Sequence, residues 1–293
     1  MTKTAWLFPG QGSQKTGMGI DLKDTKIGQD RFVQAEQILG WSVLDLCQSE
    51  PDILSRTLYT QPCLYVIETI LIDLLREQGH SPDLVAGHSL GEYVALYAAG
   101  VFDFATGLEL VKCRAELMEN ASGGKMAALI GFKSDQLQEA LEKTPDVVLA
   151  NDNSAMQVVI SGKPEAVEQV MGQIKVKKAV ALPVSGAFHS PFMEEASQKF
   201  QAVLETASFA EAKVPVLSNV DPSPSTDSHT LKNRLLEQMT GSVRWRETCL
   251  KLVDEGIEKV VEIGPGNVLT GLVKRTCPGL ALENIATLAQ VPS

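Results

Sequence analysis

The chain has 293 residues, of which 44% are hydrophobic and 21% charged, and its formal net charge is −10. This composition is typical of a globular protein with one large domain, or with a large domain that carries a small one. The negative charge argues against binding DNA or RNA mainly through phosphate contacts, although a local basic patch is compatible with it. No apolar run approaches the ~18–20 residues of a membrane span and the N-terminus lacks a signal peptide, so we expect a cytoplasmic protein.

In the N-terminal part, the hydrophobic pattern predicts a buried strand, an amphipathic helix, a second strand and two more helices, at 4–8, 62–78, 84–87, 89–99 and 105–120. After the middle of the chain, strands and helices again alternate. We expect helices at 190–206, 230–239, 244–255 and 267–275, with strands at 214–219 and 259–263. Alternation of this kind favours a mostly parallel sheet covered by helices.

The middle of the chain has a different order, with strand, helix, two strands, helix and strand at 126–131, 134–143, 147–150, 157–161, 164–174 and 178–184. This β-α-β-β-α-β order is the ferredoxin-like pattern. We therefore predict that residues 125–186 form a ferredoxin-like small domain, inserted into a larger domain made of residues 1–124 and 187–293.

The five cysteines are scattered and form no C-x-x-C pair. A widely spaced, odd-numbered set is typical of a reducing compartment, where buried thiols act as small hydrophobic side chains. We therefore expect neither a disulfide framework nor a zinc site.

The strongest chemical signal is a G-x-S-x-G motif, centred on Ser89, between a predicted strand and a predicted helix. Glycines flank the serine because the turn is tight, and the turn presents the hydroxyl above the sheet at the helix N-terminus. The alternative is a purely structural turn, but the strand–turn–helix context favours a nucleophile.

A serine nucleophile needs a general base, and the chain contains four histidines. His80 follows a helix end and His229 lies in the polar loop 221–229, so both fit solvated surface residues. His88 belongs to the turn itself, where a packing role is simpler. His189 lies where the chain returns from the small domain to the large one, and ligand sites collect in interdomain clefts. By elimination, His189 is the candidate base.

The turn after the first strand, Pro9-Gly10-Gln11-Gly12, has two interpretations. Its glycines permit backbone N–H groups to point at one spot, which suits stabilisation of an oxyanion. The same residues fit an ordinary strand-to-loop turn, and local sequence does not separate the two.

Seven motifs in order resemble the malonyl-CoA:acyl carrier protein transacylases of fatty-acid and polyketide synthesis. The resemblance covers residues 3–276, and its segments lie at 10–14 (GQGSQ), 87–92 (GHSLGE), 110–114 (LVxxR), 126–128 (MAA), 157–162 (QVVISG), 187–189 (AFH) and 262–266 (EIGPG). The run SGAFH at 185–189 is similar to the free-standing acyltransferases that serve polyketide synthases lacking built-in acyltransferase domains. The resemblance implies an α/β-hydrolase-like large domain carrying the ferredoxin-like small domain.

The resemblance also implies a role for each matching residue. Ser89 is the expected nucleophile and His189 its base, later its acid. The backbone N–H groups of Gln11 and Leu90 are the expected oxyanion hole. The guanidinium of Arg114 is expected to bind the malonyl carboxylate, and the amide of Gln61 to line the pocket. The main-chain carbonyl of Glu255 is expected to orient the histidine, and the ring of Phe188 to crowd α-branched acyl groups.

The implied reaction is double displacement, in which malonyl passes from coenzyme A to the serine and then to the phosphopantetheine thiol of an acyl carrier protein. The partner carries the phosphopantetheine, so no cofactor of the enzyme is expected. Carrier proteins are acidic, and two basic clusters are candidate docking sites or ordinary solvated faces: Lys175, Lys177 and Lys178, and Lys274 and Arg275.

Three rival functions are a hydrolase that clears acyl groups from carrier proteins, an ordinary esterase, and a scaffold without activity. Arg114 disfavours the hydrolase, because uncharged acyl groups have no use for a buried arginine. The esterase lacks an obvious triad acid. A scaffold would need none of Ser89, His189 and Arg114, so the presence of all three argues against it.

Overall fold

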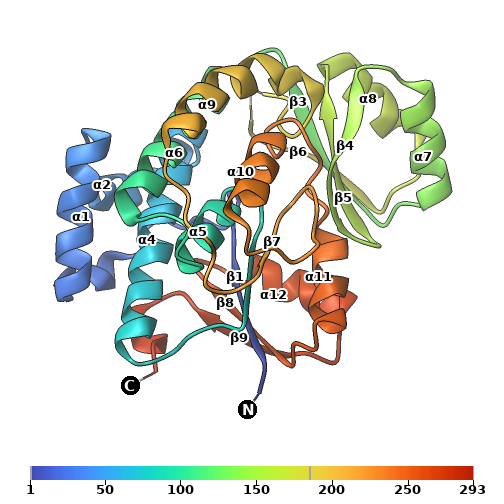
Figure 1. Cartoon of the computed structure of the whole chain (residues 1–293). Helices are drawn as coiled ribbons and strands as arrows, with labels where there is room; N and C mark the ends of the chain where they lie inside the picture. The colour runs from blue at the N-terminus through green and yellow to red at the C-terminus, as the bar shows by residue number, and fades with distance from the viewer. Residues whose placement is uncertain (1, 185, 293) are drawn as a thin grey trace.

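The computed structural model describes residues 2–184 and 186–292, so Ser185 of the run at 185–189 lies outside the described residues. The chain forms two sheets (Figure 1). The larger has five strands in the order β7-β2-β1-β8-β9, and every neighbouring pair is parallel. Its strands are β1 (Thr4–Phe8), β2 (Leu84–Gly87), β7 (Val216–Leu217), β8 (Lys259–Ile263) and β9 (Ala281–Ile285).

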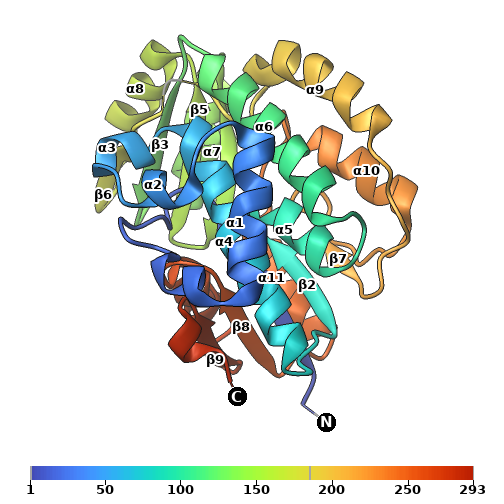
Figure 2. The same cartoon turned by 90° about the vertical axis from the view of Figure 1, so that its left-hand side faces the viewer.

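Helices cover both faces of this sheet, because successive side chains of a strand point to opposite sides. In β1, Trp6 and Phe8 join the core formed with helices that precede the small sheet, whereas Ala5 and Leu7 join a second core beneath two later helices. Figure 2 shows α1 and α4 in front of the sheet. The first face carries α1 (Lys26–Leu39), α4 (Thr57–Glu77), α5 (Gly91–Ala98) and α6 (Phe104–Asn120), and the second α11 (Trp245–Asp254) and α12 (Val268–Thr276).

The smaller sheet is antiparallel, with the order β4-β5-β3-β6. Its elements follow one another as predicted and confirm the β-α-β-β-α-β pattern. They are β3 (Lys125–Ile130), α7 (Ser134–Lys143), β4 (Val147–Ser154), β5 (Gln157–Gly162), α8 (Pro164–Gln173) and β6 (Lys178–Ala181). The mixed α/β fold, with a parallel sheet in the large part and an antiparallel sheet in the small part, therefore agrees with the predicted fold class.

Alternation along the small sheet decides which side chains face the large sheet. Ala127 and Leu129 of β3 pack beneath α7 and α8, while Met126 and Ala128 line a cavity on the other side. Strand β4 of the small sheet is bonded to the segment just before α11, since Val243 donates to Ala150 O (2.8 Å) and accepts from Asp152 N–H (2.9 Å). These bonds tie the small sheet to the part of the chain that carries α11.

The sequence patterns missed several elements. The helix predicted at 62–78 begins earlier than expected, since α4 starts at Thr57 and contains Pro62 in its interior. The patterns did not predict the edge strand β9 or the three helices between Lys26 and Leu54, which are α1, α2 (Val43–Cys47) and α3 (Pro51–Leu54). The remaining helices are α9 (Glu194–Thr206) and α10 (Ser228–Glu237), with 3₁₀ turns at Ile20–Asp24, Pro191–Met193 and Leu288–Gln290.

Two expectations need correction in detail. Strand β7 spans only Val216–Leu217 instead of 214–219, because Ser218 and Asn219 leave the sheet and Asn219 bonds the turn after β2. Helix α4 is long and apolar enough to span a membrane, contrary to the expectation that no such run exists. However, 83% of its most apolar window is buried inside the protein, which is typical of a core helix.

The turn between β2 and α5 generates the first testable prediction. A Cβ added at Gly87 would lie 1.9 Å from the carbonyl group of Gly91, whereas one added at Gly172 in α8 would meet nothing within 4 Å. Backbone cannot move aside as a flexible side chain can, so Gly87→Ala should destabilise the fold by at least about 3 kcal/mol. Gly172→Ala should stabilise it by about 0.5 kcal/mol, because alanine is the better helix former.

Urea denaturation followed by circular dichroism measures both changes. An unfolding free energy for Gly87→Ala within about 1 kcal/mol of the wild-type value would show that this turn can relax.

Candidate active site

Ser89 lies in the turn between β2 and α5, at the carboxyl end of the parallel sheet. Its φ is 54°, in the left-handed region that non-glycine residues rarely adopt. Asn219 holds this conformation from both sides, since its Oδ1 accepts from Ser89 N–H (2.7 Å) and its Nδ2 donates to Gly87 O (2.6 Å). The strained turn is therefore clamped by a side chain from a distant segment.

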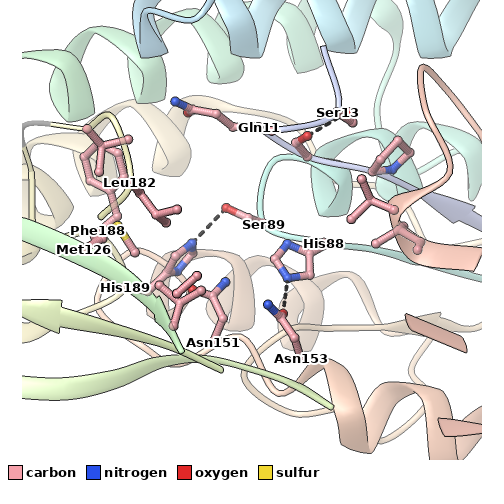
Figure 3. Close-up of a pocket in the computed structure, with 18 of the residues that line it drawn as sticks. Gln11, Ser13, His88, Ser89, Met126, Asn151, Asn153, Leu182, Phe188 and His189 are labelled. Atoms are coloured by element: carbon pink, nitrogen blue, oxygen red, sulfur yellow. Dashed lines mark hydrogen bonds between the residues drawn. The ribbon is translucent and has the colours of Figure 1, made fainter. Parts of the chain in front are cut away.

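The structure brings Ser89 and His189 together, as the sequence predicted. Ser89 Oγ lies 2.8 Å from His189 Nε2 (Figure 3). On the other side of the ring, His189 Nδ1 lies 2.9 Å from the backbone oxygen of Gln238. A carbonyl can only accept, so Nδ1 carries the ring proton and Nε2 is free to accept the serine hydroxyl proton. This is the tautomer that a general base for Ser89 requires.

The prediction that Glu255 orients His189 is wrong. Glu255 caps the end of α11, and its carbonyl accepts from Lys3 Nζ at 2.5 Å. Lys3 precedes β1, so this contact lies at the amino edge of the parallel sheet, opposite the edge where Ser89 lies. The carbonyl of Gln238, directly after α10, takes the orienting position instead. Because any residue supplies a carbonyl, residue type gave no signal for this position.

Arg114 is buried beside the serine, with a relative exposure of 1%. One terminal nitrogen donates to Gln61 Oε1 (2.6 Å), and the other donates to Ser89 Oγ and Gln238 Oε1, both at 3.0 Å. Its Nε has no partner among the described residues, and its guanidinium lies 5.4 Å from the Tyr93 ring centroid. All of these hydrogen-bond acceptors are neutral.

Gln61, which the resemblance placed in the pocket, aims its amide oxygen at Arg114. The other end of that amide donates to Met118 Sδ at 3.3 Å, and both residues line the cavity. A donor-only guanidinium selects the oxygen end of the amide. The structure thus places Gln61 against Arg114, within the wall that faces Ser89.

Burial and charge keep His189 neutral. Desolvation in the buried site, followed by the positive charge of Arg114, lowers the His189 pKa from 6.5 to about 3. The hydrogen bond from Nδ1 to the Gln238 carbonyl opposes this shift but is the weaker effect. The imidazole is therefore unprotonated, and able to accept a proton, throughout the neutral pH range.

The two expected oxyanion donors lie around the serine. Leu90 immediately precedes α5, and Gln11 lines the cavity. Gly10 permits this approach, because a Cβ there would lie 2.4 Å from His88 O. Among the described residues, neither backbone N–H donates to a protein acceptor, although the Gln11 side chain bonds Thr57 Oγ1 at 3.1 Å. Both N–H groups remain available to a ligand.

A cavity of about 220 Å³ lies between the two sheets and opens onto Ser89. Its wall is mostly apolar, and Phe188, beside the base, is buried in it. The sequence did not identify two asparagines that also line it, Asn151 and Asn153, because they follow the predicted end of a strand and asparagine is a common turn residue. The apolar lining consists of Met118, Met126, Ala128, Val159, Leu182, Val184, Phe188, Val268, Leu269 and Leu272.

The other three histidines have the structural roles that were expected for them. His88 Nε2 lies 2.8 Å from Asn153 Oδ1, and its ring packs 5.3 Å from that of Trp245. His80 and His229 are exposed. The choice of His189 among the four therefore agrees with the geometry.

The depressed His189 pKa predicts that acid destabilises the fold through this residue. The unfolded chain takes up the proton near pH 6.5, whereas the folded protein does so only near pH 3. Stability should therefore decrease as the pH falls through this window, by about 1 kcal/mol per pH unit, and a His189→Asn variant should lack this contribution. ¹⁵N NMR of the imidazole should show Nε2 unprotonated at pH 5; a His189 that titrates near pH 6.5 would contradict the prediction.

Comparison with known proteins places the chain in one family. An acyl transferase domain matches residues 5–293. A malonyl CoA-acyl carrier protein transacylase from Synechocystis is 60% identical over 291 residues, 99% of each chain, and its crystal structure superposes with a TM-score of 0.98. A polyketide biosynthesis malonyl CoA-acyl carrier protein transacylase from Bacillus velezensis is 44% identical over 92% of this chain and 95% of its own.

A further solved structure is that of a malonyl-transacylase in complex with a type II polyketide synthase acyl-carrier protein. It is 35% identical, covers 99% of this chain and 98% of its own, and has a TM-score of 0.93. The match over the whole chain, with the motif residues gathered at one cavity, shows that the protein belongs to the acyl transferase domain family and to its malonyl-CoA:acyl carrier protein transacylases.

Proposed function

We propose that the protein transfers a malonyl group from malonyl-CoA to Ser89, and from Ser89 to the phosphopantetheine thiol of an acyl carrier protein. Three relatives described above are malonyl transacylases by name, and one of them is bound to an acyl-carrier protein. The observation that carries the proposal is the buried Arg114 guanidinium, which lies 3.0 Å from Ser89 Oγ and has only neutral hydrogen-bond partners.

A buried cation without an anionic partner is unfavourable, since removing a charge from water has an effective penalty of several kcal/mol. A malonyl group supplies the missing anion, because its free carboxylate can accept two parallel hydrogen bonds from a guanidinium. An uncharged acyl group would leave the charge uncompensated. The site therefore supports malonyl transfer over the esterase and the hydrolase of uncharged acyl groups.

The first half of the reaction forms the acyl-enzyme. His189 Nε2 takes the Ser89 hydroxyl proton while Oγ attacks the thioester carbonyl, and the N–H groups of Gln11 and Leu90 stabilise the resulting oxyanion. The carbon–sulfur bond then breaks, and His189 returns the proton to the departing coenzyme A thiolate. In the second half, His189 takes the proton of the phosphopantetheine thiol, whose sulfur displaces Ser89 Oγ, and the serine recovers the proton.

Arg114 also links substrate binding to base strength. Its charge is the second largest cause of the lowered His189 pKa. A malonyl carboxylate bound to the guanidinium offsets that charge, so His189 becomes a stronger base once malonyl is in place. Acetyl-CoA cannot do this, because it lacks the carboxylate. Selectivity for malonyl would therefore appear in kcat as well as in KM.

The apolar wall serves two further purposes in this scheme. It limits the access of water to the ester, which favours transfer to a thiol over hydrolysis. Phe188, buried beside His189, would crowd an α-methyl branch, with discrimination of about 1–3 kcal/mol. We therefore expect malonyl to be preferred over methylmalonyl, with some leakage.

One of the relatives is named simply as a malonyl CoA-acyl carrier protein transacylase, and another as a transacylase of polyketide biosynthesis. The proposed carrier protein therefore serves fatty-acid or polyketide synthesis. The narrower assignment to a free-standing polyketide acyltransferase remains a prediction. The enzyme itself would need no cofactor, because the carrier protein brings the phosphopantetheine. A cytoplasmic location is supported by the five cysteines, all of which are free thiols.

Both predicted basic clusters contain a residue close to Gln157, which lines the cavity, since Ile130 pairs with Lys178 on one side and with Gln157 on the other. Lys177 packs against Gly131, whose N–H bonds Met156 O (2.8 Å), and Arg275 lies 3.5 Å from the side chain of Gln157, which lines the cavity. We define the entrance patch as Lys177, Lys178, Lys274 and Arg275, which are exposed and form no salt bridge within the described residues. An acidic carrier protein would complement it, although the protein as a whole is negative.

Intact-protein mass spectrometry after brief incubation with malonyl-CoA or acetyl-CoA tests the proposed function. We expect a malonyl adduct on Ser89 that moves to an added phosphopantetheinylated carrier protein, and no adduct in Ser89→Ala. Arg114→Ala should load malonyl at least about 100-fold more slowly, because a bidentate charge-assisted contact is lost. It should load acetyl as fast as the wild type or faster, because the charge that depresses the His189 pKa is gone.

An adduct that is lost to water while the carrier protein stays unloaded would favour the hydrolase instead. Equal losses of malonyl and acetyl loading in Arg114→Ala would show that the arginine does not recognise the carboxylate.

Charge reversal tests the entrance patch. Lys177→Glu/Arg275→Glu should reduce transfer to the carrier protein about tenfold or more at low salt and leave loading from malonyl-CoA within about twofold. Lys3→Glu/Lys213→Glu makes the same change of net charge at the amino edge of the parallel sheet, away from the cavity, and should affect neither step. Equal effects of the two double variants on transfer would refute docking at the patch.

A further inference from the structure

Glu92 is a fully buried carboxylate that the proposed reaction does not use. It lies in the first turn of α5, three residues after Ser89, and has no exposed surface. Its Oε2 accepts from Gln238 Nε2 (2.7 Å) and from Asn219 N–H (3.1 Å). Within the described residues, its Oε1 has no hydrogen-bond partner and the carboxylate forms no salt bridge.

One of its two partners, Gln238, contacts three residues of the proposed chemistry, His189, Arg114 and Ser89. Its backbone oxygen accepts from His189 Nδ1, and its side-chain oxygen accepts from Arg114 at 3.0 Å. Its side-chain nitrogen donates to Ser89 O (3.0 Å) as well as to Glu92. A small rotation of this residue would therefore move the base and the guanidinium together.

The orientation of the Gln238 amide depends on the charges at its two ends. Arg114 only donates, so it selects the oxygen end, and an ionised Glu92 only accepts, so it selects the nitrogen end. If Glu92 carried a proton or were replaced by an amide, the nitrogen end would lose its charge-assisted bond. One cation and one anion on opposite ends of the same amide therefore hold it most firmly in the orientation seen here.

The second partner, Asn219, connects Glu92 to the strained serine turn. The carboxylate bonds the backbone N–H of Asn219, whose side chain bonds both Ser89 N–H and Gly87 O. A carboxylate near a helix N-terminus is stabilised by the positive end of the helix dipole. A carboxylate at the surface would gain the same stabilisation without the desolvation penalty of full burial. The helix alone does not explain why this carboxylate is buried against two residues of the site.

We propose that Glu92 is a positioning residue for the transfer reaction, whose carboxylate fixes the Gln238 amide and, through it, the Arg114 guanidinium and the His189 ring. The inference rests on the proposed function, since the groups that it positions are those of malonyl transfer.

The ionisation of Glu92 gives this role a pH dependence. Burial raises the Glu92 pKa to about 6, against the opposing effects of Gln238, Asn219, the Ser218 hydroxyl and Arg114. The charged and titratable groups around it are Arg114 on α6 and the Tyr93 hydroxyl on α5, with His189 beyond Gln238. The carboxylate is present above about pH 6 and protonated below it, whereas the His189 pKa lies near 3. A loss of activity near pH 6 would thus come from Glu92 and not from the base.

Loading of Ser89 should be measured from pH 5 to pH 8 with malonyl-CoA and acetyl-CoA, in the wild type, Glu92→Gln and Glu92→Ala. We expect the wild-type kcat/KM for malonyl-CoA to fall about tenfold per pH unit below pH 6. At pH 7.5, Glu92→Gln should load malonyl about 10- to 100-fold more slowly, with a raised KM and a lowered kcat, and should lack the fall near pH 6. Its ratio of malonyl to acetyl loading should also drop, because only malonyl has a carboxylate for Arg114 to bind.

Glu68→Gln is the matched control, because Glu68 on α4 is also a fully buried carboxylate but has no hydrogen-bond partner among the described residues. It should keep the wild-type ratio and pH profile. Thermal melting checks that each variant is folded. If neither Glu92 variant folds, the wild-type ratio of malonyl to acetyl loading decides, because both substrates carry the same coenzyme A phosphates; this ratio should fall below pH 6.

A wild-type profile without a fall near pH 6 would overturn the proposal, as would a fall that persists in Glu92→Gln, since coenzyme A phosphates also ionise in this range. Equal losses with malonyl and acetyl would likewise reject it in favour of a structural role. If the wild type forms no malonyl ester at any pH, the proposed function itself fails.

Discussion

The burial of one positive charge beside the serine is the constraint on which the rest of the site depends. Arg114 is surrounded by apolar and neutral groups, so its five N–H donors must find acceptors inside the protein or in a ligand. Gln61 and Gln238 supply neutral oxygens. The negative charge that balances the guanidinium comes from Glu92, which is bonded to the other end of the Gln238 amide, and from the incoming substrate. Recognition of a carboxylate is therefore a consequence of how the core is packed.

The same charge connects recognition to chemistry. It lies 3.0 Å from Ser89 Oγ and lowers the pKa of the neighbouring His189, so the free site combines a weakened base with a cation that no anion contacts directly. A substrate that brings an anion pairs with the guanidinium and thereby raises the pKa of His189. Gln238 also connects Arg114 and His189 through direct contacts, because its backbone oxygen bonds the histidine and its side-chain oxygen bonds the arginine.

Much of the fold and part of the site could be predicted from local sequence. Ser89 was identifiable because a nucleophile turn needs glycines at fixed offsets, and the small domain was identifiable because its strands and helices have regular hydrophobic periods. Arg114, Gln11 and Leu90 were accessible only through the resemblance to a family, since an arginine on a helix or a glycine-rich turn has ordinary structural explanations. Glu255 shows the limit of that route: a role performed by a backbone carbonyl leaves no trace in residue type, and Gln238 performs it instead.

The sequence by itself determined the order of most elements, the β-α-β-β-α-β pattern of the smaller sheet and its helices, the nucleophile turn and the choice of His189 among four histidines, because each depends on local spacing or on a short list of candidates. Only the tertiary structure decided which carbonyl orients the base, that Asn219 clamps the serine turn, and that Glu92 and Arg114 grip opposite ends of one amide. These contacts join residues 49 to 146 positions apart, with Asn219 and Ser89 separated by 130. They arise because parallel strands bring their carboxyl ends to one edge of the sheet, where segments that are distant in sequence meet.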